Sequence, residues 1–170
     1  MEEALRYLNK GYLYSLISLL LLVVTLVFPL LAILDLALIA LSAYNLYKGF
    51  SKLAKIDKRY APGKWGLILI FIGTPLALIK PLAPLGGLIA FVGVIEYFVG
   101  LWRLSKMKGG ELIRYGIIVS ALAYASGIVA FTQLNPYLYL LVELFMASIA
   151  STLLYLGTKR LLAEKPWLTR

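Results

Sequence analysis

Three acidic residues lie inside long apolar stretches of the sequence: Asp35, Glu96 and Glu143. A carboxylate near the centre of a bilayer costs about 2.5–3.5 kcal/mol on insertion scales, so an acid in such a position calls for an explanation. Two explanations stay open. The acids take up and release a cation or a proton as a relay, or they form structural hydrogen bonds to neighbouring helices or to a partner subunit.

The acids do not share one depth along their helices. Asp35 and Glu143 follow the prolines that open their apolar runs by six and seven residues, whereas Glu96 precedes the basic residue Arg103 by seven. At 1.5 Å per residue, the first two lie about 10 Å from one membrane surface and Glu96 about 10 Å from the other. Ser42 extends a polar stripe along the same helix as Asp35.

No set of residues in the sequence is typical of an active site. The chain has no Cys and no His, which removes the commonest general base, thiol nucleophiles and the usual zinc and haem ligands. It also has no G-x-S-x-G, no H-E-x-x-H and no glycine-rich phosphate loop after a strand. We therefore expect no catalytic residue, no metal, no cofactor and no enzyme activity.

The composition is that of an integral membrane protein. Hydrophobic residues make up 62% of the 170 residues and the mean hydropathy is +0.89, whereas soluble domains have about 45–50% apolar residues. This length predicts one transmembrane domain over residues 1–170. The net charge of +9 lies at the ends of apolar runs, which indicates contact with lipid headgroups and not with nucleic acid.

The apolar runs divide into six predicted helices. A hydrocarbon core of about 30 Å needs about 20 helical residues, so the run from Gly11 to Tyr47 is too long for one span, and Pro29 divides it into a hairpin. Pro75 is expected to kink the third helix. The predicted fold is an all-α bundle of three hairpins, with helices at about residues 11–28, 30–47, 65–79, 85–104, 115–133 and 137–157.

The second helix is expected to continue beyond the membrane. Phe50, Leu53, Ile56 and Tyr60 recur at helical spacing with basic residues between them. This pattern predicts an amphipathic extension that lies along the headgroups until Pro62 and Gly63 break it.

Charge predicts the orientation. Every Lys and Arg except Lys80 falls at the chain ends or in the two loops on one side of the six-helix arrangement, which places both termini in the cytoplasm of a plasma-membrane protein. Aromatic residues on that side, among them Tyr12, Trp65 and Trp102, are expected to form an interfacial belt. The basic residues expected to contact lipid headgroups or a partner are Lys52, Lys55, Lys58, Arg59 and Lys64.

Small residues mark faces where helices can approach closely. Gly86, Gly93 and Gly100 recur every seven residues in the fourth helix, and Gly116 and Gly127 lie in the fifth. Glycines at such spacing admit a neighbouring backbone, so these five positions are predicted to be helix-packing sites.

The second and sixth helices align without gaps. Residues 35–53 match residues 143–161 when Asp35 is placed on Glu143, with Leu46 on Leu154 and Gly49 on Gly157. Duplication of a hairpin and chance similarity of leucine-rich helices both explain the match. Duplicated hairpins would be related by an axis along the membrane normal.

Residues 44–76 read YNLYKGFSKLAKIDKRYAPGKWGLILIFIGTPL. This stretch, about a fifth of the chain, resembles archaeal multipass membrane proteins that are grouped as a domain of unknown function. The shared features are a helix that ends in Gly-Phe-x-x-Leu (residues 49–53), a basic loop, and a helix with Gly63 and Gly66. The resemblance implies an archaeal plasma membrane and no particular activity.

Two functions remain. The first is a non-enzymatic accessory or scaffold subunit that binds other membrane subunits, or a second copy of itself, through its glycine faces and basic surface. The alternative is a small cation- or proton-coupled transporter that uses Asp35, Glu96 and Glu143.

Overall fold

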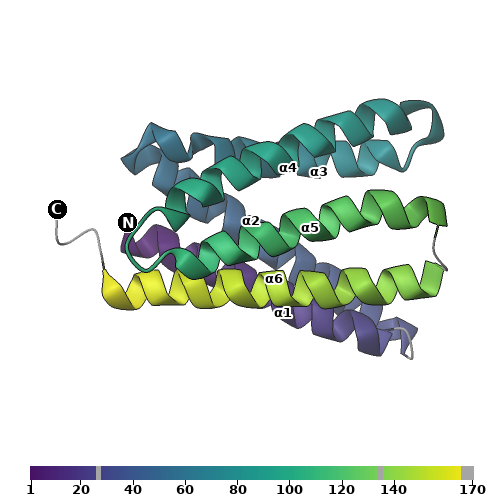
Figure 1. Ribbon diagram of the computed structural model, residues 1–170, viewed down its shortest axis with the longest axis horizontal. Coiled ribbons are helices and arrows are strands. Elements are labelled where there is room, and N and C mark those ends of the chain that lie inside the picture. The colour runs from purple at the N-terminus through teal and green to yellow at the C-terminus, as the bar shows by residue number, and fades with distance from the viewer. Residues whose placement is uncertain (26–27, 134–135, 166–170) are drawn as a thin grey trace.

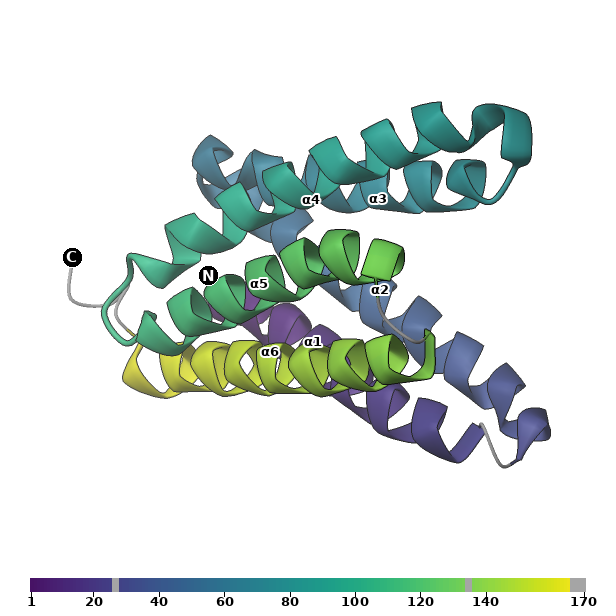
Figure 2. The same cartoon turned by 45° about the vertical axis from the view of Figure 1, so that its right-hand side comes forward.

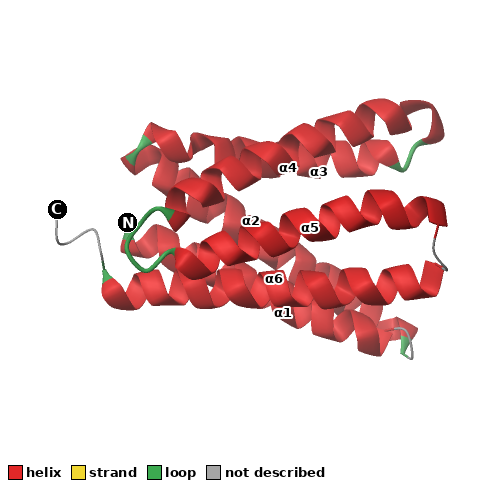
Figure 3. Ribbon diagram, viewed as in Figure 1, coloured by secondary structure: helices red, strands yellow, loops and turns green. Residues whose placement is uncertain are grey.

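The computed structural model describes residues 1–25, 28–133 and 136–165, without the side chains of residues 126–141. Within this part of the chain there are six α-helices and no strand, which confirms the prediction of an all-helical fold (Figure 3). The helices are α1 (Glu2–Thr25), α2 (Ala32–Ile56), α3 (Ala61–Ala77), α4 (Ala83–Ser105), α5 (Glu111–Gln133) and α6 (Pro136–Glu164). Short 3-10 turns precede α2, α3 and α4: η1 (Pro29–Leu31), η2 (Lys58–Tyr60) and η3 (Lys80–Leu82).

The helices form three antiparallel hairpins, α1–α2, α3–α4 and α5–α6, and α1 also packs on α6 (Figure 1). The N-terminus, η2, the turn between α4 and α5 and the end of α6 gather at one end of the bundle, which we call the basic end. The turns η1 and η3 lie at the opposite, far end. The α3–α4 ribbons separate from α5–α6 toward the far end in both views (Figure 2).

Three of the described segments are long and apolar enough to cross a membrane: Glu2–Thr25, Pro29–Ile56 and Lys80–Ser105. Their outer surfaces expose large apolar side chains, for example Leu30 with 88% of its surface accessible. A surface of this kind fits hydrocarbon better than water. The α3 helix has 17 residues and is about 26 Å long, slightly less than the bilayer core.

Several predicted helix bounds are wrong because they follow hydropathy alone. The first helix begins at Glu2 and not near residue 11, and the last ends at Glu164 and not near residue 157. Charged residues continue both helices: Arg6 pairs with Glu2 at 2.6 Å one turn apart, and Arg160 pairs with Glu164 at 2.6 Å. Such pairs support a helix outside the membrane, where a search for apolar runs finds no helix.

The predicted amphipathic extension at the headgroups is also wrong. Phe50 and Leu53 have no exposed surface and Tyr60 is buried, so these side chains belong to the core. Only Ile56 is exposed. Helical spacing alone does not distinguish a face that packs on lipid from a face that packs on protein.

The break between α2 and α3 occurs at Asp57 and not at Pro62. Asp57 has extended backbone angles and its carboxylate accepts the backbone N–H of Arg59 at 2.9 Å. Pro62 lies in the first turn of α3, where a missing N–H costs nothing. Pro75 likewise lies two residues before the end of α3, so it is part of the helix terminus and not of a mid-helix kink.

The densest packing is at the basic end. The side chains with almost no exposed surface come from five of the helices: Leu5, Leu8, Phe50, Leu53, Leu101, Leu104, Ile113, Thr158 and Leu161. This core joins the three hairpins near the basic end and leaves room between them further along the bundle.

The first and third hairpins share the same packing. On α1–α2, Leu46 covers Gly11 and Leu8 covers Gly49; on α5–α6, Leu154 covers Gly116 and Ile113 covers Gly157. The buried positions of α6 (150, 154, 157, 158 and 161) are also those that the alignment matches to buried positions 42, 46, 49, 50 and 53 of α2. The shared contacts favour hairpin duplication over chance similarity.

Candidate functional site

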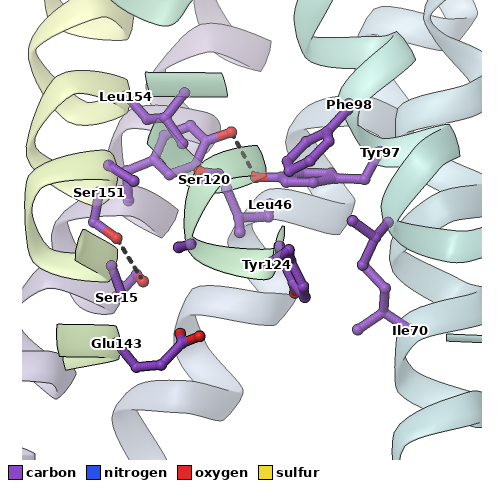
Figure 4. A pocket seen from close by; sticks show the side chains of 15 residues that line it. Ser15, Leu46, Ile70, Tyr97, Phe98, Ser120, Tyr124, Glu143, Ser151 and Leu154 are labelled. Carbon is purple, nitrogen blue, oxygen red and sulfur yellow. Dashed lines mark hydrogen bonds between the residues drawn. The ribbon is translucent and has the colours of Figure 1, made fainter. Parts of the chain in front are cut away.

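A cavity of about 290 Å³ lies in the middle of the bundle and is lined by all six helices (Figure 4). It lies between the α3–α4 hairpin and helices α1, α2, α5 and α6. Its apolar lining includes Leu46, Ile70 and Leu154. Its polar lining consists of Tyr12, Ser15, Tyr97, Ser120, Tyr124, Glu143 and Ser151.

A tyrosine pair lies at the side of the cavity nearest the basic-end core. The hydroxyl groups of Tyr12 on α1 and Tyr97 on α4 are 2.7 Å apart and form a hydrogen bond. Phe50, in the core, contacts the ring of Tyr97 edge to face with centroids 5.7 Å apart. The pair therefore connects α1 to α4 and stands between the cavity and the core.

Aromatic rings form one wall of the cavity. The Phe98 ring lies 6.2 Å from Tyr97 and 6.2 Å from Tyr124, centroid to centroid. The contact with Tyr124 is edge to face at 76° and joins α4 to α5. The negative faces of such rings attract cations, most strongly where water is excluded.

Glu143 is the one predicted acid that lines the cavity. Figure 4 shows its carboxylate pointing into the cavity, toward the side where Tyr124 lies. Nearby, the hydroxyl oxygens of Ser15 and Ser151 are 3.4 Å apart and form a hydrogen bond. The cavity thus combines one ionisable group, several hydroxyl groups and aromatic rings.

Asp35 lies elsewhere, in the interface between α1 and α2. It is 6% exposed and accepts a hydrogen bond from Ser18 at 2.5 Å. Ser42 lies two turns further along the same side of α2, and its hydroxyl donates to the carbonyl oxygen of Gly11 at 2.9 Å. The polar stripe of α2 therefore holds the hairpin together and does not reach the cavity.

Glu96 is half-buried on α4 and is not among the residues that line the cavity. It makes no hydrogen bond or ion pair with the part of the chain that the structure describes. The three acids therefore do not form one cluster among the described residues.

The predicted packing glycines lie against neighbouring helices. A Cβ atom on Gly93 would be 2.7 Å from the backbone nitrogen of Ile70, and one on Gly100 would be 2.5 Å from the Cα of Gly63, so α3 and α4 touch through their backbones. A Cβ atom on Gly86 would also meet the backbone of α3. Gly116 packs under Leu154. Gly127 is outside the residues whose side-chain environment is described.

The predicted basic contact residues lie around the α2–α3 turn. Lys52 pairs with Glu3 at 2.9 Å, and Lys64 lies over the Trp65 ring at 5.0 Å. Arg59 pairs with Asp57 at 2.7 Å, and its hydrogen bond is the main reason that the pKa of Asp57 falls below its usual value. Lys55 and Lys58 are exposed.

Sequence reasoning missed the tyrosine pair. Tyr12 was expected in the interfacial belt, but it is buried, whereas Trp65 and Trp102 are exposed as a belt requires. One pattern in the sequence does indicate a buried polar contact there: Tyr12, Ser15 and Ser18 recur every three residues on α1 and form a polar stripe inside an apolar helix.

The chain matches no protein family, no curated protein and no solved structure.

Proposed function

We propose that the protein is a multipass plasma-membrane protein in which all six helices cross the bilayer and both termini are cytoplasmic. The three apolar spans and the gathering of basic segments at one end of the bundle (Figure 1) support this orientation. The archaeal origin implied by the sequence resemblance is part of the same proposal.

The orientation is tested with single cysteines, because the native chain has none. A cysteine beside Pro84, at the far end, should react with a membrane-impermeant maleimide added to intact cells, and a cysteine at Lys108 should react only after the cells are opened. Labelling of the Lys108 site in intact cells would contradict the orientation.

For the function, we propose a small transporter that exchanges an organic ammonium ion for a proton. The observation that carries this proposal is the Glu143 carboxylate pointing into an aromatic-walled cavity (Figure 4). A carboxylate supplies the counter-charge that a cation needs inside a membrane, and the rings of Tyr97, Phe98 and Tyr124 add cation–π attraction. The cavity volume suits a small organic cation better than a bare metal ion.

Coupling follows from competition for one group. Ionised Glu143 holds the cation, whereas protonation removes the negative charge and with it the attraction. Because proton and cation compete for the same carboxylate, each lowers the affinity for the other by the same factor. A proton gradient then drives the cation in the opposite direction.

For the bound cation to reach the cytoplasm, the hydrogen bond between Tyr12 and Tyr97 has to break. The α3–α4 hairpin is held to the other helices mainly near the basic end, through the core around Phe50. Rocking of this hairpin as a unit would open the tyrosine pair and expose the cavity to the other side.

The test is uptake of the fluorescent cation ethidium into proteoliposomes under a pH gradient. Wild-type protein should concentrate the dye, and Glu143→Gln should reduce uptake to the level of protein-free liposomes. Glu96→Gln is the matched control, because it removes an acid outside the cavity, and it should transport normally. Ala147 also lines the cavity, so Ala147→Phe, which fills it, should stop uptake without changing the charge.

The proposal fails if wild-type protein moves no dye above empty liposomes, or if Glu143→Gln transports like wild type. The cavity is the reason to prefer a transporter over an accessory subunit, which needs no internal ionisable group. Stoichiometric co-purification with other chains after extraction in mild detergent would support the accessory subunit.

A further inference from the structure

A second hollow of about 320 Å³ lies on the outer surface of α2 near the basic end. The six residues that line it follow one another at intervals of one or three and so share one side of the helix. They are Tyr44, Tyr47, Lys48, Ser51, Lys52 and Lys55. We call this hollow the lysine groove.

Lys48 is held in place at the centre of the groove. Its Nζ donates to the hydroxyl oxygen of Tyr44 at 2.9 Å. The same ammonium lies 4.9 Å from the ring centroid of Tyr7 on α1 and 5.2 Å from that of Tyr44. An ammonium held between two rings loses little further freedom when it binds an anion, and it still has N–H groups to donate.

The groove keeps an excess of positive charge. Lys52 pairs with Glu3 at 2.9 Å, which offsets one of the three ammonium groups. Lys55 is exposed and has no ion-pair partner within the described residues. Lys48 and Lys55 are therefore available to an anion.

An apolar strip continues from the groove toward the far end on the same face of α2. Ile33, Ala37 and Leu41 are exposed there at four-residue intervals, and Tyr44 follows Leu41 by three residues. A free phosphate would use only the charged part of this surface, whereas an amphiphile with an anionic head would use both parts.

We propose that the lysine groove binds the phosphate of an anionic membrane phospholipid, with one hydrocarbon chain along Leu41 and Ile33. Basic pockets on the cytoplasmic side of membrane helices bind such headgroups. The site differs from the general basic surface predicted from the sequence, because it is centred on Lys48 and does not include Lys58, Arg59 or Lys64. It is also independent of the cavity and of transport.

The test measures phosphatidylglycerol retained by the full-length protein in native mass spectrometry from mild detergent. Each of Lys48→Gln and Lys55→Gln should weaken binding about fivefold, since one lysine near an anionic surface contributes about that factor. Tyr44→Phe keeps the ring but loses the hydroxyl that positions Lys48, so it should also weaken binding. Lys106→Gln, a change in the other basic loop, should retain lipid like wild type.

The competing explanations give different results. Inorganic phosphate should not displace the lipid; full displacement would assign the groove to free phosphate and overturn the proposal. An equal loss with Lys106→Gln would show attraction by overall charge alone, which also overturns it. A melting curve by circular dichroism for each variant shows that the chain is folded, so retained lipid in folded Lys48→Gln and Lys55→Gln variants contradicts the proposal directly.

Discussion

The α1–α2 and α5–α6 hairpins pack in the same way but place their acids differently. In both, a glycine of the first helix lies under a leucine of the second, Gly11 under Leu46 and Gly116 under Leu154. Yet Asp35 is buried between α1 and α2, whereas Glu143 faces the central cavity.

The partner helices also differ at an aligned position. Counted from the matched glycines, Ser18 of α1 corresponds to Ala123 of α5. Ser18 gives Asp35 a hydroxyl donor at 2.5 Å, whereas Ala123, at the corresponding position, lines the cavity together with Glu143. The two hairpins thus share one packing scaffold but place their acids in different surroundings.

The largest expected effect is a difference in stability between two variants at one aligned position. Phe50 of α2 and Thr158 of α6 occupy this position, and both side chains are buried. Phe50→Ala should lower the free energy of unfolding by about 3–5 kcal/mol, because it empties the core where α2, α3 and α4 meet. Thr158→Ala should cost about 1 kcal/mol, because it removes hydrogen bonds with Asn9 and Leu154 but little volume. Unfolding in mixed micelles measures both. Equal losses would contradict the assignment of Phe50 to the core, and Phe71→Ala, at an exposed position of α3, is the control.

A smaller effect should be the same in both hairpins. Gly49→Leu and Gly157→Leu each force a side chain into Leu8 or Ile113, so each should destabilise the protein by about 1–3 kcal/mol. Gly87→Leu is the control, since a Cβ atom there meets nothing within 4 Å. Melting temperatures in detergent give the comparison, and a large effect in only one hairpin would break the equivalence.

Substitutions at the two acids' neighbouring positions test how far the surroundings of Asp35 and Glu143 differ. Asp35→Asn and Ser18→Ala should each cost about 0.6 kcal/mol, as is usual for a hydrogen bond between membrane helices, and the double variant should cost less than their sum. Ala123→Ser places a hydroxyl group on the cavity wall beside Glu143 and should change thermal stability and dye uptake together. Unchanged stability and uptake in Ala123→Ser would show that position 123 does not set the role of Glu143.

The smallest effect concerns the α2–α3 turn, which connects the first hairpin to the second. The pKa of Asp57 is lowered by its hydrogen bonds with Arg59, so its contribution to stability is present above the ordinary carboxyl pKa of about 4 and is lost as the pH falls through the lower folded value. Asp57→Asn should therefore melt slightly below wild type at pH 7, and the difference should shrink as the pH falls below the ordinary carboxyl pKa of about 4. A difference that is constant with pH would contradict this role.

Much of the fold could be predicted from the sequence. Apolar runs divided by Pro29 and by glycines gave six helices in the right order, because burial in hydrocarbon demands continuous helices. The bounds at the basic end were wrong because α1 and α6 continue through charged residues, and because Phe50 and Tyr60 pack on protein. The sequence alone favours an accessory subunit, whereas the cavity, which depends on how the helices pack, is what supports the transporter proposal.

The sequence by itself determined the number of helices, the single end at which basic residues gather, and the matched positions of Asp35 and Glu143. Only the tertiary structure decided that one acid is buried against Ser18 while the other lines a cavity, and that Tyr12 meets Tyr97 across the bundle. The physical reason is that helix formation depends on the residues of the helix itself, whereas the environment of a side chain depends on which residue of another helix lies opposite.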